Sequence, residues 1–188
     1  LLLADALAFA DGCQPKWNET LAELQAQGSA TSARVRGAFQ CLWGDHTPNP
    51  HDAVASVYAE AALPQGWVTL DRALERREYD DLDRSSSLWA RQDRTLAEVL
   101  ATFGPPSIWF GGTSPYYPKT LAYTTEPEGA QSLTCFHLWN CPQPAAAPHR
   151  AAHHEPILLA VRHPSPSHPF ADRFTFTPAG ACHRHPEY

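Results

Sequence analysis

The spacing of apolar residues predicts helices in the first half of the chain. Between residues 31 and 43, Val35, Ala38, Phe39 and Leu42 stand at positions i, i+3, i+4 and i+7, which places them on one face of a helix. Apolar spacing and capping residues predict further helices over these segments: 1–10, Asn18 to Gly28, Asn49 to Pro64, 70–80 and 85–92.

Two helices carry clear terminal signals. "NPHD" is expected to begin one helix, with Asn49 as the N-cap and Pro50 in the first helical position. "TLAEVLATFGPP" predicts another, because Thr95 and Glu98 have the spacing of a capping box. Gly104 is typical of a helix C-terminus, and the two prolines that follow it cannot continue a helix.

The second half of the chain has the pattern of short strands between turn residues. Of 18 prolines, 14 lie after residue 104, so long helices are disfavoured there. "EPEG" predicts a hairpin turn, and the continuous apolar run of 156–162 predicts a central strand. The expected strands are 107–110, 119–125, 132–140, 156–163 and 173–178.

These elements predict the α+β class, with N-terminal helices packed on a C-terminal antiparallel sheet of four to five strands. The length of 188 residues suits one domain spanning 1–188. Within it, residues 1–94 are expected to be mainly helical. Residues 95–188 are expected to add one helix and the sheet.

Charge and cysteine content narrow the class of partner and the compartment. The net charge of −6 argues against nucleic acid and favours a protein partner with a basic surface. Five cysteines, an odd number with no CxxC, favour reduced thiols in the cytoplasm.

No apolar run reaches the ~18 residues of a membrane span. "LLLADALAFADGC" lacks a basic start and contains Asp5, so an amphipathic helix is favoured over a signal peptide.

Histidines are the candidate metal ligands. Seven residues near the C-terminus have side chains of the types that bind metals, namely His153, His154, Glu155, His163, His168, His183 and His185. An HExxH motif is absent. If 156–162 is a strand, Glu155 and His163 lie about 26 Å apart at ~3.3 Å per residue, which is too far for one metal ion. His183 and His185 remain as a local pair, because residues two apart on a strand share a face.

Nucleophilic chemistry has weaker sequence support. No GxSxG motif occurs. Cys135 and His137 would share a strand face, but catalysis also needs an exposed thiolate and an orienting group. "FGGTSPYY" has no GxGxxG or GKS and is interpreted as a structural connection. The sequence therefore predicts no catalytic residue and no cofactor.

An acidic segment and a group of aromatic residues are the candidate partner-binding positions. "ERREYDDLD" contains five carboxylates that could meet a cationic surface, namely Glu75, Glu78, Asp80, Asp81 and Asp83. Trp109, Tyr116 and Tyr117 lie in a segment rich in Gly and Pro, and such residues dominate binding hot spots. The alternatives are a solvated helix end for the acidic segment and core packing for the aromatic residues.

Three stretches resemble bacterial immunity proteins of polymorphic-toxin and type VI secretion systems. They are "FGPPSIWFGGTSPYYPKTLAYTT", "CFHLWN" and "EPILLAVRHP...FTFTPAG", within residues 95–180. The resemblance implies a cytoplasmic protein that neutralises a cognate toxin by stoichiometric occlusion. The resemblance implies no catalytic residue in this chain.

Two other classes stay open. One is a metal-dependent hydrolase that uses the C-terminal histidines. The other is an envelope scaffold, because "TLAEVLATFGPPS" followed by strands resembles a unit of small outer-membrane lipoproteins.

Overall fold

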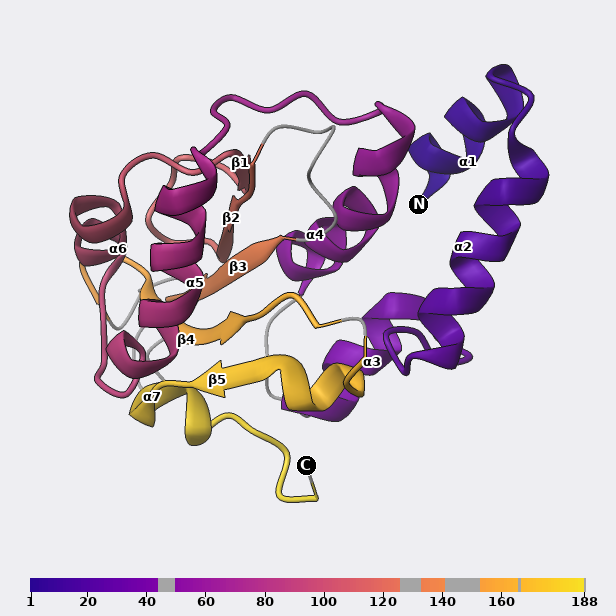
Figure 1. Cartoon of the computed structure of the whole chain (residues 1–188). Helices are drawn as coiled ribbons and strands as arrows, with labels where there is room; N and C mark the ends of the chain where they lie inside the picture. The colour runs from indigo at the N-terminus through magenta and orange to yellow at the C-terminus, as the bar shows by residue number, and fades with distance from the viewer. Residues whose placement is uncertain (44–49, 126–132, 141–152, 166, 188) are drawn as a thin grey trace.

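The computed structural model describes residues 1–43, 50–125, 133–140, 153–165 and 167–187. Within these ranges the chain has the predicted α+β fold (Figure 1). The α-helices are α1 (Leu2–Ala10), α2 (Gln14–Ala26), α3 (Arg34–Trp43), α4 (His51–Ala62), α5 (Arg76–Trp89), α6 (Leu96–Phe103) and α7 (Pro178–Ala181). Two 3-10 helices, η1 (Leu63–Gln65) and η2 (Phe170–Arg173), complete the helical part.

All five predicted strands are present, and they form one antiparallel meander. They are β1 (Ile108–Phe110), β2 (Lys119–Tyr123), β3 (Thr134–Trp139), β4 (Ile157–Arg162) and β5 (Phe174–Phe176). The order in space is β1-β2-β3-β4-β5, so each strand pairs with its neighbours in sequence. As predicted, β4 is an interior strand. The "EPEG" turn lies outside the described residues.

Helices α3 and α4 cover one face of the sheet, and α1 and α2 pack outside them (Figure 1). Phe39 of α3 packs edge-on against the ring of Phe174 in β5, with ring centroids 6.0 Å apart. Ala160 of β4 belongs to the same buried cluster as Val57 of α4. Next to it, Ala122 of β2 packs with residues at the end of α4 and in η1. The N-terminal helices therefore bury this face, which confirms the predicted arrangement.

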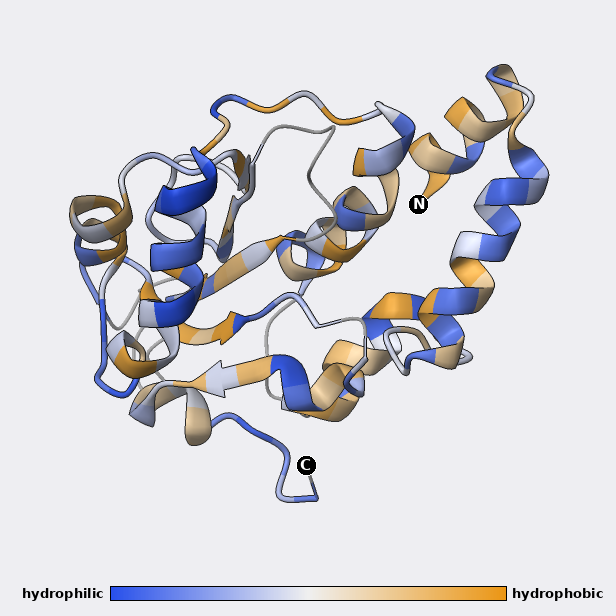
Figure 2. Ribbon diagram, viewed as in Figure 1, coloured by the Kyte–Doolittle hydropathy of each residue, from blue (hydrophilic) through white to orange (hydrophobic). Residues whose placement is uncertain are grey.

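Helices α5 and α6 cover the opposite face. Leu82 of α5 and Val99 of α6 are buried against Phe136 and Val161 of the sheet. Because both faces are covered, β2 and β3 are buried along their whole length. In Figure 2, β3 and β4 are largely hydrophobic, whereas α5 is largely hydrophilic apart from the narrow stripe toward the sheet.

One prediction about the helices is wrong, because residues 70–80 and 85–92 are not two short helices. A single helix, α5, runs from Arg76 to Trp89. Tyr79, Leu82, Ser86 and Trp89 follow the three- and four-residue spacing of one buried or half-buried face. The serines between the charged residues hide this pattern, because Ser86 occupies a position where an apolar residue is expected.

Other helix boundaries differ from the prediction by a few residues. α2 begins at Gln14 rather than Asn18, because Pro15 suits the first turn, where its missing N–H group needs no partner. α3 begins at Arg34, after a tight backbone pairing with Thr31. Pro50 precedes α4 instead of occupying its first position, and Asn49 lies outside the described residues.

Candidate functional site

Arg162, the last residue of β4, is a charged side chain in the centre of the fold. Its position on the strand directs it to the face covered by α4, and it is fully buried there. It forms an ion pair with Glu60 of α4 and donates to Ser56 Oγ (3.4 Å) and Cys135 Sγ (3.2 Å). Burial alone would lower the pKa of this guanidinium, but Cys135 and Glu60 hold its pKa above the usual value.

Arg173, in η2, brings a second guanidinium to the same region. It is 7% exposed, donates to Gln27 Oε1 (3.1 Å) and donates to the carbonyl of His168 (3.2 Å). Burial lowers its pKa, and Arg162 acts in the same direction, whereas Glu60 raises it. Among the described residues, no carboxylate lies within ion-pair distance of Arg173. Its charge is therefore held by neutral acceptors.

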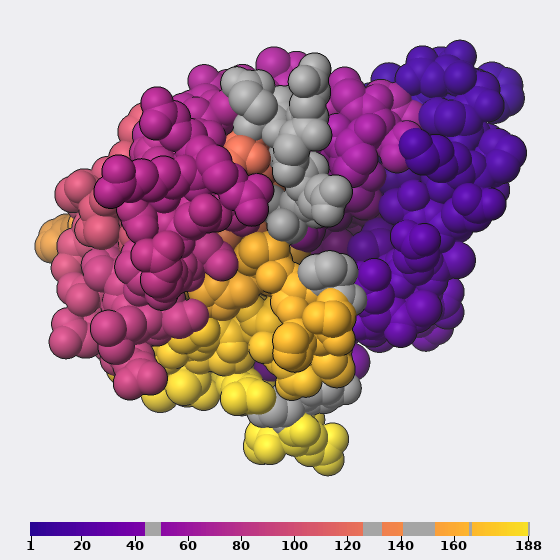
Figure 3. All heavy atoms as spheres, in the orientation of Figure 1, coloured from indigo at the N-terminus to yellow at the C-terminus, as the bar shows by residue number. Residues whose placement is uncertain are grey.

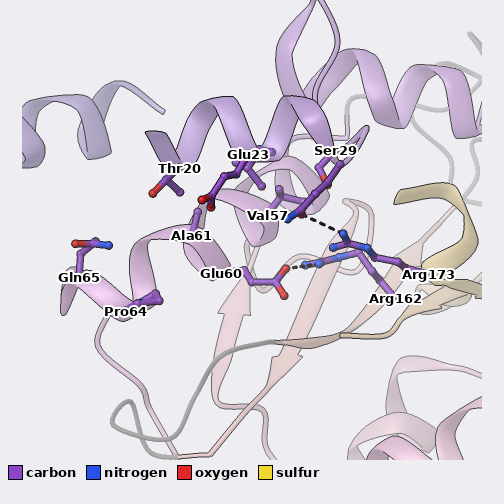
Figure 4. Close-up of a pocket in the computed structure, with 12 residues that line it drawn as sticks. Thr20, Glu23, Ser29, Val57, Glu60, Ala61, Pro64, Gln65, Arg162 and Arg173 are labelled. Carbon is purple, nitrogen blue, oxygen red and sulfur yellow. Dashed lines mark hydrogen bonds and ion pairs between the residues drawn. The ribbon is translucent and has the colours of Figure 1, made fainter. Parts of the chain in front are cut away.

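The two arginines line a pocket of about 230 Å³ between α2, α4, β4 and η2 (Figure 4). Ser29 lies in the α2–α3 loop and is 1% exposed, and its hydroxyl has no hydrogen-bond partner among the described residues. The Nε of Arg162 is likewise without a partner in the described part of the chain. The remaining lining residues are Thr20, Glu23, Leu24, Gln27, Val57, Glu60, Ala61, Pro64 and Gln65. The pocket thus combines two arginines and two glutamates, and two of its lining residues carry buried polar groups without a partner in the described part of the chain.

Sequence reasoning missed this pocket. Its lining comes from segments 20–29, 57–65, Arg162 and Arg173, which only the tertiary fold brings together. One sequence signal existed, since Arg162 ends an apolar strand that was expected to be central. A charge at such a position needs a buried partner.

Four of the five carboxylates of the acidic segment lie on α5, and these four contact basic side chains of the chain itself. Ion pairs join Glu78 to Arg72, Asp80 to Arg76 (3.2 Å) and Asp81 to Arg84 (3.0 Å), and Asp83 Oδ1 lies 3.2 Å from His163 Nδ1. Glu75 is the exposed residue that precedes α5. This internal pairing weakens the field that the segment presents to a partner.

Asp83, His163 and Ser87 are arranged in the order of a catalytic triad. His163 Nδ1 lies 3.2 Å from Asp83 Oδ1, and His163 Nε2 lies 3.0 Å from Ser87 Oγ. Ser87, however, lies within α5, where backbone N–H groups are bonded to carbonyls four residues earlier and cannot form an oxyanion hole. Thr175 Oγ1 also shares His163 Nε2 at 3.2 Å. We therefore interpret the group as a hydrogen-bonded connection between α5 and the sheet.

The three aromatic candidates separate into one core residue and two surface residues. Trp109 of β1 is half-buried and packs on the cluster beneath α5 and α6. Tyr116 and Tyr117 are 59% and 65% exposed. Core packing, the alternative interpretation, therefore describes Trp109, whereas the two tyrosines remain available to a partner.

The loop that carries the two tyrosines is held in place from below. Lys119 is 1% exposed, and its Nζ donates to the carbonyls of Gly112 (2.6 Å) and Ser114 (2.5 Å). Asn140 Nδ2 donates to the carbonyl of Pro115 (3.0 Å). These bonds fix the backbone that immediately precedes the exposed rings.

The structure does not bring the acidic segment and the tyrosines together. Asp83 accepts a hydrogen bond from Thr134, at the start of β3, whereas Asn140 holds the tyrosine loop beyond its end. Six residue steps of strand separate these points by about 20 Å at ~3.3 Å per residue.

The histidines do not form a metal site in the described part of the chain, where no group of three or more His, Cys, Asp or Glu residues could hold a metal ion. His183 packs edge-on against Trp139 (4.8 Å between ring centroids), and burial lowers its pKa. Cys135 and His137 share one face of β3, as predicted, but both are buried. Burial raises the pKa of the Cys135 thiol and lowers that of His137, so both are neutral near pH 7.

Comparisons with known proteins give no relative for this chain. No family model, no curated protein and no solved structure matches it. Among the described helices, none combines the length and apolar character that crossing a bilayer requires.

Proposed function

We propose that the chain is an inhibitory binding protein of the immunity class, acting in the cytoplasm on a cognate toxin. The sequence resemblance over residues 95–180 motivates this proposal. The observation that carries it is the loop with Tyr116 and Tyr117, whose rings are exposed while Lys119 and Asn140 fix the backbone. A pre-organised loop loses little entropy on binding, so exposed aromatic residues on it suit a binding surface.

Electrostatics gives the acidic residues a secondary role. The net charge of −6 favours encounter with a basic surface. Glu75, Glu78, Asp80 and Asp81 are exposed, but three of these four pair with arginines of the chain. We therefore assign the anchoring contacts to the tyrosines, and to the acidic segment an effect on association rate.

A binding experiment with the toxin encoded beside the gene tests this proposal. The double change Tyr116→Ala/Tyr117→Ala is expected to weaken the complex by about thirtyfold or more, which corresponds to ~2 kcal/mol for one hot spot. It should leave the melting temperature nearly unchanged, because both rings are exposed. The change Phe9→Ala, which removes an exposed ring on α1, is the matched control and should bind normally.

The same experiment can contradict the proposal. Absence of a complex at micromolar concentration, or failure to protect cells from that toxin, would rule out the immunity function. If the tyrosine variant and the Phe9 variant lost equal affinity for the toxin, the tyrosine loop would not be part of the interface.

A further inference from the structure

We propose that the pocket between α2, α4, β4 and η2 binds a small molecule with a single carboxylate, which Arg173 and Ser29 receive. This proposal is independent of toxin binding, because neither the acidic segment nor the tyrosine loop lines the pocket.

Arg173 is the charged group of the pocket that lacks a paired carboxylate among the described residues, and this favours a bound anion beside it. Arg162 and Glu60 form an ion pair and cancel one another. Arg173 has only the amide oxygen of Gln27 and the carbonyl of His168 as partners, although it is almost fully buried. A buried cation without a counter-charge is costly, and a bound carboxylate would offset that cost. The planar guanidinium also matches a carboxylate in geometry.

Two buried groups without a partner belong to residues that line the same pocket. The Ser29 hydroxyl and the Arg162 Nε are both buried, both lack a partner among the described residues, and both residues line the pocket. In Figure 4 the side chains of Arg162 and Arg173 lie side by side, and a dashed line joins Arg162 to Glu60. Native proteins contain few unsatisfied buried groups, so two of them at one pocket mark it as a candidate ligand site.

The size and the acidic lining limit the ligand. A volume of about 230 Å³ lies below the usual range for drug-sized molecules, which indicates a small metabolite. Glu60 and Glu23 also line the pocket, and they would repel a second negative charge. A monocarboxylate therefore fits better than a dicarboxylate or a phosphate dianion.

Calorimetric titration of the full chain at constant ionic strength tests the ligand class, with butyrate, succinate and inorganic phosphate as probes. Butyrate is expected to bind with a Kd of about 1 mM or tighter. Succinate and phosphate should bind at least about tenfold more weakly because of the second charge. The proposal is overturned by phosphate or succinate binding as tightly as butyrate, or by no binding of any probe.

Two variants locate the bound butyrate. Ser29→Ala should weaken butyrate binding about tenfold, the effect of one lost hydrogen bond. It should also raise the melting temperature of the free protein, because it removes a buried hydroxyl without a partner. Arg173→Gln should weaken binding by about tenfold to a hundredfold. Since Arg173→Gln can also perturb folding, Ser29→Ala is the decisive variant.

Matched changes on α5 serve as controls. Ser85→Ala and Arg77→Gln alter exposed residues outside the pocket and should leave butyrate binding unchanged. Butyrate affinity equal to that of the unmodified protein in Ser29→Ala, or a lowered melting temperature in that variant, would contradict the assignment of the hydroxyl to the site.

Discussion

Gly180 determines how closely the last helix can approach the sheet. A Cβ atom at this position would lie 1.8 Å from the carbonyl oxygen of Leu159, a backbone atom that cannot move aside easily. Thr177 tightens the same contact, since its hydroxyl donates to the carbonyl of Leu158 (2.7 Å) while accepting from the Gly180 N–H (3.0 Å). Glycine is therefore required here by packing rather than by backbone conformation.

We expect Gly180→Ala to destabilise the protein by about 1–3 kcal/mol, the usual range for overpacking. The clash has to outweigh the gain of up to ~1 kcal/mol that alanine brings within a helix. Urea denaturation measures the effect. Gly112→Ala is the control, because nothing lies within 4 Å of its added Cβ. Equal midpoints for the two variants would contradict the packing argument.

Residue-level prediction from the sequence succeeded where the interaction is local. The capping box of Thr95 and Glu98 was predicted from a spacing of three residues, and both of its hydrogen bonds are present. Arg162 and Glu60 are 102 positions apart, and their contact depends on how α4 crosses the sheet. Spacing along the chain carries no information on such a pair.

At the scale of elements, α5 is joined to the sheet by polar contacts as well as by packing. Asp83 accepts from Thr134 of β3 (3.1 Å) and lies beside His163, which follows β4. The hydrogen bond from His163 lowers the pKa of Asp83, desolvation opposes this effect, and Thr134 reinforces it. The carboxylate form is thus favoured in the folded state.

A lowered pKa has a defined consequence for stability against pH. The stability that the Asp83 carboxylate gives the folded state is fully present above the unfolded pKa of about 3.9. It is lost as pH falls through the lower pKa that Asp83 has in the folded state. We expect Asp83→Asn to destabilise the protein at pH 5, and we expect the difference from the unmodified protein to shrink toward pH 3. Urea midpoints across this interval measure it.

Asp80→Asn is the control for this prediction, because its ion pair with Arg76 is exposed. It should show a small effect on stability. A constant difference between Asp83→Asn and the unmodified protein from pH 5 to pH 3 would contradict the proposed linkage.

The wrong prediction of two short helices over 70–80 and 85–92, where the structure has the single helix α5, also has its cause at the scale of elements. The strands were predictable because turn residues bound each apolar run. α5 was not, because its buried face contains Ser86 and its exposed face is dense in charge. Only the neighbouring sheet shows that this serine position is an interior one.

At the scale of the whole molecule, the two parts of the chain are held together through the sheet. Figure 3 shows the N-terminal helices and α5 on opposite sides of the visible face, with C-terminal residues between them. Glu60 comes from the helical part and Arg162 from the sheet part, so their ion pair links the two. The α+β class could be predicted from the order of elements, but the division of the helices between the two faces could not.

Glu60→Gln tests this connection. Removing the carboxylate leaves Arg162 buried without a counter-charge, and we expect the free energy of unfolding to fall by about 3–5 kcal/mol. Asp81→Asn breaks the exposed pair with Arg84 and should cost at most about 1 kcal/mol. Chemical denaturation of both variants measures the contrast, and similar losses would show that the buried pair has no special role.

The lengths of the strands also affect how the protein behaves in a crowded solution. β1 and β5, at the two edges of the sheet, have three residues each, whereas the apolar strands β3 and β4 lie inside it. An edge strand presents unpaired backbone groups on which another chain can add a strand, and a short edge offers few of them. The six-residue apolar strands β3 and β4, a type of segment that can form amyloid-like stacks, are therefore kept where a second molecule cannot reach them until the sheet opens.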